Sequence, residues 1–465
     1  MTDLTQFTAA ALAEGVKAGA FTARAVAEAH LARIAAHDGR VGAFTAVTTE
    51  RALAEADAVD VKRRSGAPLG PLAGVPYAVK NLFDVVGLPT LAGSKINRDH
   101  PPAARDAALI EKLAAADAVL LGALNMGEYA YDFTGENAHV GPSRNPHDLM
   151  RMTGGSSGGS GAAAAAGFVP VTLGSDTNGS IRVPASLCGL FGLKPTFGRL
   201  SRARSFPFVT SLDHLGPLGR STADCAAFYD AMRGHDPDDP VSQDRPAPPL
   251  GPEVGAGIGG LRIARATGYF NGMQEAAARD ATALVAGALG AGVVEIPHVA
   301  AARAAAFVLT CSEGGALHLD RLRTRAADFD PDTRDRLIAG ALLPAAHVAT
   351  AHRVRAKYRD AMRALFRDVD VIIAPATPTR APALGQKTFD LDGQRVPVRA
   401  NLGLFTQPFS FIGLPVMSVP VWTAGETLPI GVQIIAPAWR EDIVVRVAGH
   451  LERAGLVGAR IARLD

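Results

Sequence analysis

Apolar residues along this chain follow two different rhythms. Residues 4 to 64 are rich in alanine, with leucine, valine and isoleucine at spacings of three and four, as in ARAVAEAHLARIAAH. This period predicts helices. Farther along, short apolar runs with β-branched residues alternate with helical stretches, and these runs predict buried strands. They lie at 75–80, 118–123, 168–175, 261–266, 292–297, 370–375, 416–421 and 430–436.

Strands that alternate with helices indicate the α/β class. Helices between strands cover both faces of a sheet, and apolar runs without strict alternation are typical of interior strands. Residues 235–260 are rich in proline, aspartate and glycine and predict a long loop, where a domain boundary is one interpretation. Because strands of similar character lie on both sides, we favour a surface loop within one domain spanning 1–465, with a helical N-terminal part at 1–65.

Charge and cysteine content exclude several function classes. The chain has 47 basic and 45 acidic residues, and no block of five like charges, so charge gives no reason to expect nucleic-acid binding. Its three cysteines, Cys188, Cys225 and Cys311, lie far apart without a CxxC pair, which disfavours a zinc ribbon or a disulfide framework. Reduced thiols suggest a cytoplasmic protein.

The chain shows no sign of export or of a membrane span. Its N-terminus lacks the basic and long apolar regions of a secretory signal. The longest weakly polar run, GAAAAAGFVPV, falls short of the about 20 apolar residues that a membrane helix needs. We therefore expect a cytoplasmic protein without a membrane partner.

Two glycine motifs resemble known functional motifs but lack the predicted structural context that those motifs need, and the histidines do not indicate a metal site. Gly255, Gly257 and Gly260 spell GxGxxG, but a Pro-rich loop precedes them and a predicted strand follows, the reverse of a dinucleotide site. GGSSGG contains GxSxG, yet the preceding NPHDLMRMT is not predicted as the strand that a nucleophile elbow needs. No HExxH and no metal-ligand spacing of histidines occur, so no metal is expected.

Residues 153–182, TGGSSGGSGAAAAAGFVPVTLGSDTNGSIR, concentrate small hydroxyl side chains on glycine-rich backbone. A flexible linker would lack the small-residue helix and the strand that this segment contains. Glycine and serine inside packed α/β structure mark either close-packed turns or a binding loop. Both interpretations stay open on composition alone.

Three residues make the binding-loop interpretation more specific. Lys80 ends the run GVPYAVK, where it is either a surface charge or a buried amine. Ser156 either caps the Ala-rich helix or belongs to a site. Ser180 follows Asp-Thr-Asn-Gly at the start of a short helix, as an N-cap or beside an oxyanion-binding turn. The backbone N–H groups that would form this turn belong to Thr177, Asn178, Gly179 and Ser180.

The chain resembles the amidase signature family over nearly all of its length. The resemblance runs through PLAGVPYAVKNLFDVVGLPTLAGS, NMGEYAYDFTGENAHVGPSRNPHD, GGSSGGSGAAAAAGFVPVTLGSDTNGSIRVPASLCGLFGLKPTFGRLS, SLDHLGPLGRS, IIAPATPTRAP, IGLPVMSVP and LPIGVQIIAPAWRED. It implies a single large α/β/α domain around a mixed central sheet covered by helices on both faces. This expectation agrees with the pattern of apolar runs.

The resemblance also implies a catalytic triad and a mechanism. Carried over by position, Ser180 is the nucleophile, Ser156 is a bridging serine in a cis peptide, and Lys80 is the base. The turn from Thr177 to Ser180 would form the oxyanion hole. The residues that would support the triad are Ser157, Asp176 and Arg182. The reaction passes through an acyl-enzyme and requires no metal or cofactor, because a buried neutral lysine can act as the base.

Local departures from the family pattern leave the triad intact. Asn81 stands where an aspartate is usual after the lysine, Thr153 where a proline is common, and Asn178 where a glycine is frequent. Because no triad member is lost, a non-enzymatic scaffold is disfavoured.

The substrate is harder to read from the sequence. FTGENAHVGPSRNPHD and SFPFVTSLDHLGPLGRS look most like the family's hydrolases of small ureido acids, which implies a 1-carboxybiuret-like substrate and a small helical partner subunit in a heterotetramer. The alternatives are a general small-amide amidase and the glutamine-hydrolysing subunit of a tRNA-dependent amidotransferase. The latter usually has glutamine where His214 stands. The residues that we expect in the substrate pocket are Tyr131, Asp132 as acceptor from a urea N–H, and Arg380 as a forked partner of a carboxylate.

Overall fold

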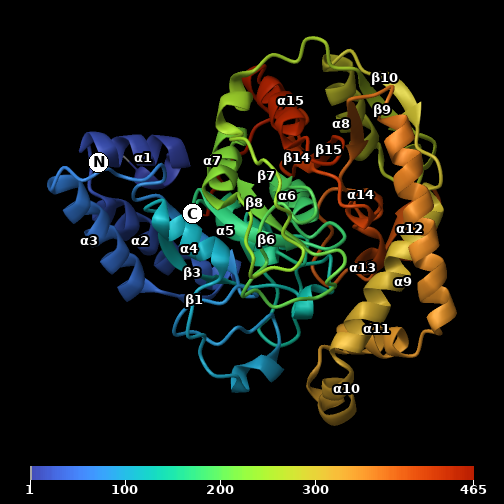
Figure 1. Cartoon of the computed structure of the whole chain (residues 1–465), viewed down its shortest axis with the longest axis horizontal. Coiled ribbons are helices and arrows are strands. Elements are labelled where there is room, and N and C mark those ends of the chain that lie inside the picture. Colours follow the sequence, from blue (N-terminus) through green and yellow to red (C-terminus); the bar gives the residue numbers. More distant parts are fainter. Residues whose placement is uncertain (1–2, 465) are drawn as a thin grey trace.

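One sheet of eleven strands organises the computed structural model, which describes residues 3–464 (Figure 1). Its strands are β1 (Phe44–Val47), β2 (Pro76–Lys80), β3 (Val119–Leu124), β6 (Val171–Asp176), β7 (Phe191–Lys194), β8 (His214–Gly219), β9 (Ile263–Thr267), β10 (Gly292–Glu295), β11 (Val371–Pro375), β14 (Val416–Val421) and β15 (Ile430–Ile435). Their spatial order is β1-β3-β2-β6-β8-β7-β14-β15-β11-β9-β10.

The sheet is mixed. β2 runs parallel to both of its neighbours, β3 and β6, and β9 runs parallel to β10 and β11. The strands between these two groups pair antiparallel. Helices flank the sheet (Figure 1), so the expected α/β class with a mixed central sheet is confirmed.

Fifteen α-helices are found within residues 3–464. They are α1 (Ala9–Ala18), α2 (Ala23–Val41), α3 (Thr49–Arg64), α4 (Ala108–Ala115), α5 (Gly158–Ala165), α6 (Arg182–Cys188), α7 (Thr222–Met232), α8 (Ala276–Ala288), α9 (Val299–Leu317), α10 (Leu319–Arg325), α11 (Pro331–Ala341), α12 (Ala345–Leu365), α13 (Val398–Asn401), α14 (Gln407–Phe411) and α15 (Glu441–Arg453). α5 and α6 pack against each other over the sheet, and so do α7 and α15.

All eight strands predicted from apolar runs are present in the sheet. Three further strands of the main sheet, β1, β7 and β8, were not predicted. β1 also corrects the expectation that residues 4–64 are helical throughout. Strands from both sides of residues 235–260 belong to the same sheet, with β8 before that segment and β9 after it. The single-domain organisation stays our prediction, and this continuity supports it.

Two other sequence predictions are wrong in detail. β10 is not a buried strand: it lies at the edge of the sheet, and Val293 is 69% exposed. NPHDLMRMT does contain a strand, because β5 (Asp148–Met152) pairs with β4 (Arg144–Asn145). This pair forms a separate two-stranded sheet, as do β12 (Thr388–Leu391) and β13 (Gln394–Pro397), so the GxSxG segment still does not follow a strand of the main sheet.

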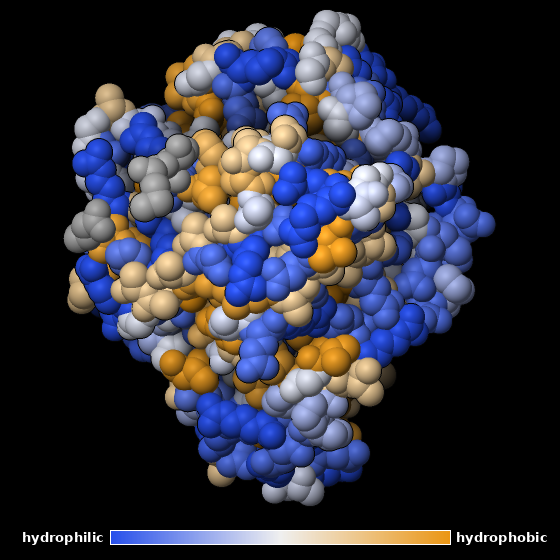
Figure 2. Space-filling model, turned by 90° about the vertical axis from the view of Figure 1, so that its left-hand side faces the viewer, coloured by the Kyte–Doolittle hydropathy of each residue, from blue (hydrophilic) through white to orange (hydrophobic). Residues whose placement is uncertain are grey.

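The surface has no single apolar face in the view of Figure 2. Hydrophobic residues there are interspersed with hydrophilic ones, as on most folded proteins. Across residues 3–464, no helix combines the length and the apolar character needed to cross a membrane. Over the same residues, no three His, Cys, Asp or Glu side chains are grouped as ligands for a metal ion.

Candidate active site

Lys80 occupies the last position of β2, beside the end of β6. The parallel register that pairs Val79 with Leu173 carries Lys80 toward Ser175. The side chain of Lys80 is completely buried, and its Nζ lies 2.7 Å from Ser156 Oγ and 2.8 Å from Ser175 Oγ. Lys80 is therefore a buried amine and not a surface charge.

Burial changes the acid–base behaviour of this amine. Loss of hydration lowers the pKa of Lys80 to about 7, although the nearby carboxylates of Asp213, Asp176 and Asp132 act in the opposite direction. A lysine with this pKa is neutral in a large share of molecules at neutral pH. Its nitrogen lone pair is then available to accept a proton.

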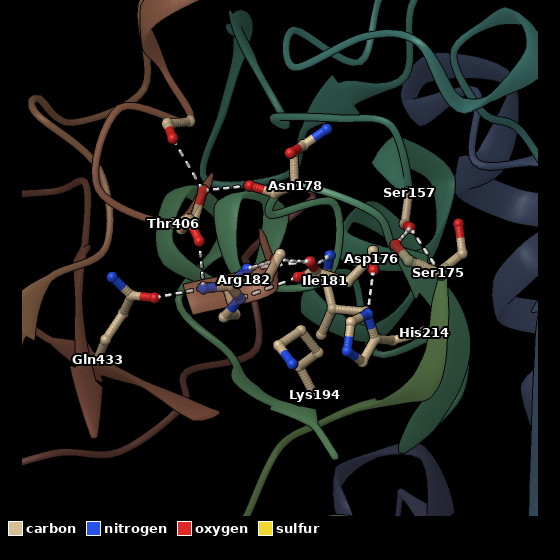
Figure 3. A network of polar contacts seen from close by, with 12 residues as sticks. Ser157, Ser175, Asp176, Asn178, Ile181, Arg182, Lys194, His214, Thr406 and Gln433 are labelled. Atoms are coloured by element: carbon tan, nitrogen blue, oxygen red, sulfur yellow. Dashed lines mark hydrogen bonds and ion pairs between the residues drawn. The ribbon is translucent and has the colours of Figure 1, made fainter. Parts of the chain in front are cut away.

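Ser156 follows a cis peptide bond between Gly155 and Ser156, and it is fully buried. Ser157 immediately precedes α5, but its hydroxyl contacts neither Ser156 nor Lys80. Instead, Ser157 Oγ donates to the carbonyl of Ser175 at 3.2 Å and accepts from its N–H at 3.3 Å (Figure 3). Ser157 thus positions Ser175, whose hydroxyl is the second one that Lys80 Nζ contacts.

Ser175 is a functional candidate that sequence reasoning missed. It lies on β6 immediately before Asp176 and accepts a hydrogen bond from Lys80 Nζ. The available signal was its place at the end of a buried strand that runs parallel to the strand of Lys80. Using that signal required knowing that β2 and β6 are neighbours.

The turn from Thr177 to Ser180 connects β6 to α6. Gly179 has φ +145°, and a Cβ at this position would lie 2.1 Å from Thr406 Oγ1. Thr406 Oγ1 donates to the carbonyl of Asn178 at 2.7 Å (Figure 3). The close approach of Thr406 to the turn therefore depends on glycine at 179.

The backbone N–H groups of this turn are available to a ligand. Within residues 3–464, the N–H groups of residues 177–180 make no hydrogen bond. The side chains are held elsewhere: Thr177 Oγ1 donates to Asp213 at 2.6 Å and Asn178 Nδ2 donates to Thr310 at 2.8 Å. Several free N–H groups on one turn suit an oxyanion.

A buried ion pair clamps the ends of the turn. Arg182 donates from Nε and Nη2 to the two oxygens of Asp176 at 2.9 and 3.0 Å, and neither side chain is exposed (Figure 3). Burial alone would raise the pKa of Asp176, but the Arg182 guanidinium holds it below its usual range. Arg182 Nη1 also donates to Thr406 O at 3.0 Å and to Gln433 Oε1 at 2.6 Å.

His214 supports the same turn from β8. Its Nδ1 lies 3.0 Å from the carbonyl oxygen of Asp176, so this nitrogen carries the proton that the hydrogen bond needs (Figure 3). Burial lowers the pKa of His214 well below its usual value. A neutral His214 therefore holds the backbone at the start of the turn, although sequence reasoning gave it no role.

Ser180 opens into a small pocket that contains two arginines. Arg336 comes from α11 and Arg399 from α13, and both line the pocket with Ser180. Tyr131 also lines it, with the Arg336 guanidinium 3.7 Å above its ring and its hydroxyl 2.7 Å from Cys311 Sγ. Neither arginine was named from the sequence.

Asp132 lines the pocket, but its carboxylate oxygens already have partners. They accept from the backbone N–H groups of Thr134 and Gly135 at 2.9 and 2.6 Å, and from Thr134 Oγ1 at 2.7 Å. Arg399 Nη1 lies 3.1 Å from Asp132 Oδ1. Asp132 therefore orients Arg399, and a urea N–H would have to compete for its oxygens.

Arg380 is not part of this pocket. Its guanidinium donates to Thr423 Oγ1 at 2.6 Å and to the carbonyl of Leu428 at 3.1 Å, and it lies 3.7 Å from Glu426. It lines a separate hollow that contains none of the triad residues. The expected contact between Arg380 and a substrate carboxylate is thus corrected: Arg336 and Arg399 are the arginines beside Ser180.

Comparisons with known proteins agree on a family. A protein-family model described as Amidase matches residues 25–445. The chain is 56% identical to AtzE, the 1-carboxybiuret hydrolase subunit of Pseudomonas sp. (strain ADP), over 95% of this chain and 97% of that protein. It is 39% identical to a subunit of the glutamyl-tRNA(Gln) amidotransferase of Streptomyces coelicolor, over 98% and 97% of the two chains.

Solved structures give the same result. One, described as "an unexpected vestigial protein complex" that "reveals the evolutionary origins of an s-triazine catabolic enzyme", superposes with a TM-score of 0.97 at 55% identity, covering 98% of this chain and all of that one. A bacterial aryl acylamidase of the amidase signature enzymes superposes with a TM-score of 0.88 at 27% identity, covering 97% of each chain.

Proposed function

The chain belongs to the amidase signature family and is a serine amidase that hydrolyses amide C–N bonds, and we propose that its substrate is a small anionic ureido acid of the 1-carboxybiuret type. The observation that carries this proposal is the pocket in which Ser180 lies with Arg336 and Arg399. The planar guanidinium group suits a carboxylate. The similarity to the 1-carboxybiuret hydrolase of Pseudomonas supports the same substrate class.

We assign the proton transfers to Lys80, Ser156 and Ser180. Neutral Lys80 accepts the proton of Ser156, which accepts the proton of Ser180 as its Oγ attacks the substrate carbonyl. The 2.7 Å contact between Lys80 Nζ and Ser156 Oγ supports the first transfer. Ser175 accepts a hydrogen bond from Nζ at 2.8 Å and so directs the lone pair of the neutral amine toward Ser156.

The tetrahedral intermediate would place its oxyanion on the turn at residues 177–180. Its collapse breaks the C–N bond, and the proton held by Lys80 returns through Ser156 to the departing nitrogen. Water then attacks the acyl-enzyme, gives its proton to the same relay, and releases the carboxylic acid with Ser180 regenerated. The free N–H groups of the turn support the oxyanion assignment.

The pocket favours an anion over an amino acid. Glutamine, the substrate of the alternative amidotransferase function, carries an α-ammonium group beside its carboxylate. Of the pocket-lining residues within 3–464, Asp132 is the only acid, and Arg399, Thr134 and Gly135 already engage its oxygens. An ammonium group would therefore lack an uncommitted carboxylate partner. A substrate carboxylate, in contrast, can pair with Arg336, which has no carboxylate within 4.0 Å among residues 3–464, whereas Arg399 already contacts Asp132 and Asp332.

Steady-state assays of the purified chain on 1-carboxybiuret, glutamine and a neutral amide of similar size test this proposal. We expect the highest kcat/KM on 1-carboxybiuret. A higher kcat/KM on glutamine would favour the amidotransferase function, and preference for the neutral amide would favour a general small-amide amidase.

We further propose a location and a partner subunit. Cys188, Cys225 and Cys311 are free and buried, which supports the cytoplasm as the compartment. We propose a small helical partner in a heterotetramer, and the fact that a similar solved structure is a protein complex supports the existence of a partner. Co-expression with a candidate small subunit, followed by measurement of the complex mass, tests the second of these assignments.

A further inference from the structure

An arginine-lined groove runs along α12, away from the pocket of Ser180. Arg355, Arg359 and Arg363 recur every four residues and so lie on one face of the helix. They line two adjoining hollows of about 440 and 480 Å³ that share Arg359 and Ile412. Neither hollow contains Lys80, Ser156 or Ser180.

The more basic end of this groove has an unusual composition. Arg245, from the segment 235–260, lines it together with Arg359 and Arg363, and every other lining residue there is apolar. Trp439 forms part of the wall, with the Arg245 guanidinium 4.9 Å from its ring centre. The backbone of Trp439 has φ +72°, a conformation that bulky residues rarely adopt.

The cations at the end of the groove beside Trp439 are poorly neutralised by the chain itself, whereas Arg355, at the other end, shares the groove with Glu313. Within residues 3–464, Arg245 and Arg359 have no carboxylate within 4.0 Å, and the contact of Arg363 with Asp360 is 3.5 Å between two exposed side chains. Like charges four residues apart on a helix destabilise it. Anionic groups from outside the chain would relieve this repulsion.

We propose that this groove binds an extended acidic segment of another polypeptide, with apolar side chains between its carboxylates. The groove follows α12 from Arg355 to Phe366, a rise of about 16 Å, which matches about five extended residues. Carboxylates on the segment pair with the arginine row, while Trp439 and Ile412 contact its apolar side chains. This inference concerns binding of a protein and does not depend on the proposed substrate.

Selection of a random phage-displayed peptide library against the full chain tests the proposal. We expect enriched peptides in which Asp or Glu alternates with apolar residues. Because the chain has two tryptophans, Trp422 and Trp439, a Trp422→Phe background reports peptide binding through the fluorescence of Trp439 alone. Binding should weaken as salt is added, since the contacts are charge pairs at the surface.

Charge reversal in the groove supplies the control. Arg359→Glu should raise the Kd of the selected peptides by about tenfold or more. Arg353→Glu, on the same helix but outside the groove, should change it by less than about twofold. Amidase activity should be unchanged in both variants.

Three outcomes would overturn the proposal: enriched peptides without acidic residues, equal losses from Arg359→Glu and Arg353→Glu, or full competition by free glutarate at the peptide's own concentration. The last outcome would assign the groove to small anions rather than to a polypeptide.

Discussion

Lys80 Nζ lies 2.7 Å from Ser156 Oγ, with both residues completely buried. This contact joins the end of β2 to the glycine-rich segment that precedes α5. It brings the base beside the hydroxyl that relays its proton in our proposal. Because burial lowers the pKa of Lys80 to about 7, we expect the protonation of this lysine to control activity near neutral pH.

The pH dependence of kcat/KM follows from that value. Only neutral Lys80 accepts a proton, and the neutral fraction grows as pH rises through the pKa. We expect kcat/KM to increase about tenfold per pH unit below 7 and to level off above it. Lys80→Arg should abolish activity at every pH, because a guanidinium keeps its proton in a protein. A pH-independent profile, or an active Lys80→Arg variant, would remove Lys80 from the mechanism.

Gly179→Ala should damage the oxyanion turn. The added Cβ would meet Thr406 Oγ1 at 2.1 Å, and φ +145° disfavours alanine. We expect kcat to fall roughly 100-fold or more, as when an oxyanion donor is displaced. Gly257→Ala is the matched control, since no atom lies within 4 Å of its added Cβ. Similar kinetics for the two variants would show that the turn tolerates displacement.

The Asp176–Arg182 pair should be a large stability determinant. Asp176→Asn leaves the Arg182 guanidinium buried with less compensation, and breaking a buried pair in this way costs about 3–5 kcal/mol. Arg24→Ala breaks an ion pair with Asp57 in which both side chains are about half exposed, and should cost less than about 1 kcal/mol. Urea denaturation of both variants measures the two free energies of unfolding; equal values would contradict the clamp.

Arg399→Ala should impair carboxylated substrates selectively. We expect kcat/KM on 1-carboxybiuret to fall about 30- to 1,000-fold, which corresponds to roughly 2–4 kcal/mol, while a neutral amide of similar size is much less affected. Arg380→Ala serves as control because Arg380 lies in a different hollow. Equal losses on the charged and the neutral substrate would show that Arg399 is structural.

The sequence predicted the sheet better where strands are simple apolar runs. It missed β8, which contains Pro217 and two glycines in HLGPLG, because proline and glycine disfavour an interior strand. β8 nevertheless lies between β6 and β7. The pairing of β8 with β6 and β7 on its two sides outweighs the low strand preference of its proline and glycines.

Some residues of the candidate site could be predicted from the sequence and others could not. Ser156 and Ser180 lie in a segment rich in glycine and serine, Lys80 ends a predicted strand, and the family resemblance identified the three as a triad. Arg336 and Arg399 stand in helices with no such local signal. The folded chain brings both arginines beside Ser180. The sequence alone did not show this proximity, and Arg380 was predicted in their place.

Turnover of 1-carboxybiuret by Ser180→Ala tests whether Ser180 is the nucleophile. The substitution removes the oxygen that attacks the substrate while leaving the backbone of the turn in place. We predict that kcat falls by several powers of ten with an unchanged Tm, as for loss of a nucleophile in other serine hydrolases. A Ser180→Ala enzyme that keeps more than roughly a few per cent of wild-type kcat would contradict the account, because another residue would then have to be the nucleophile.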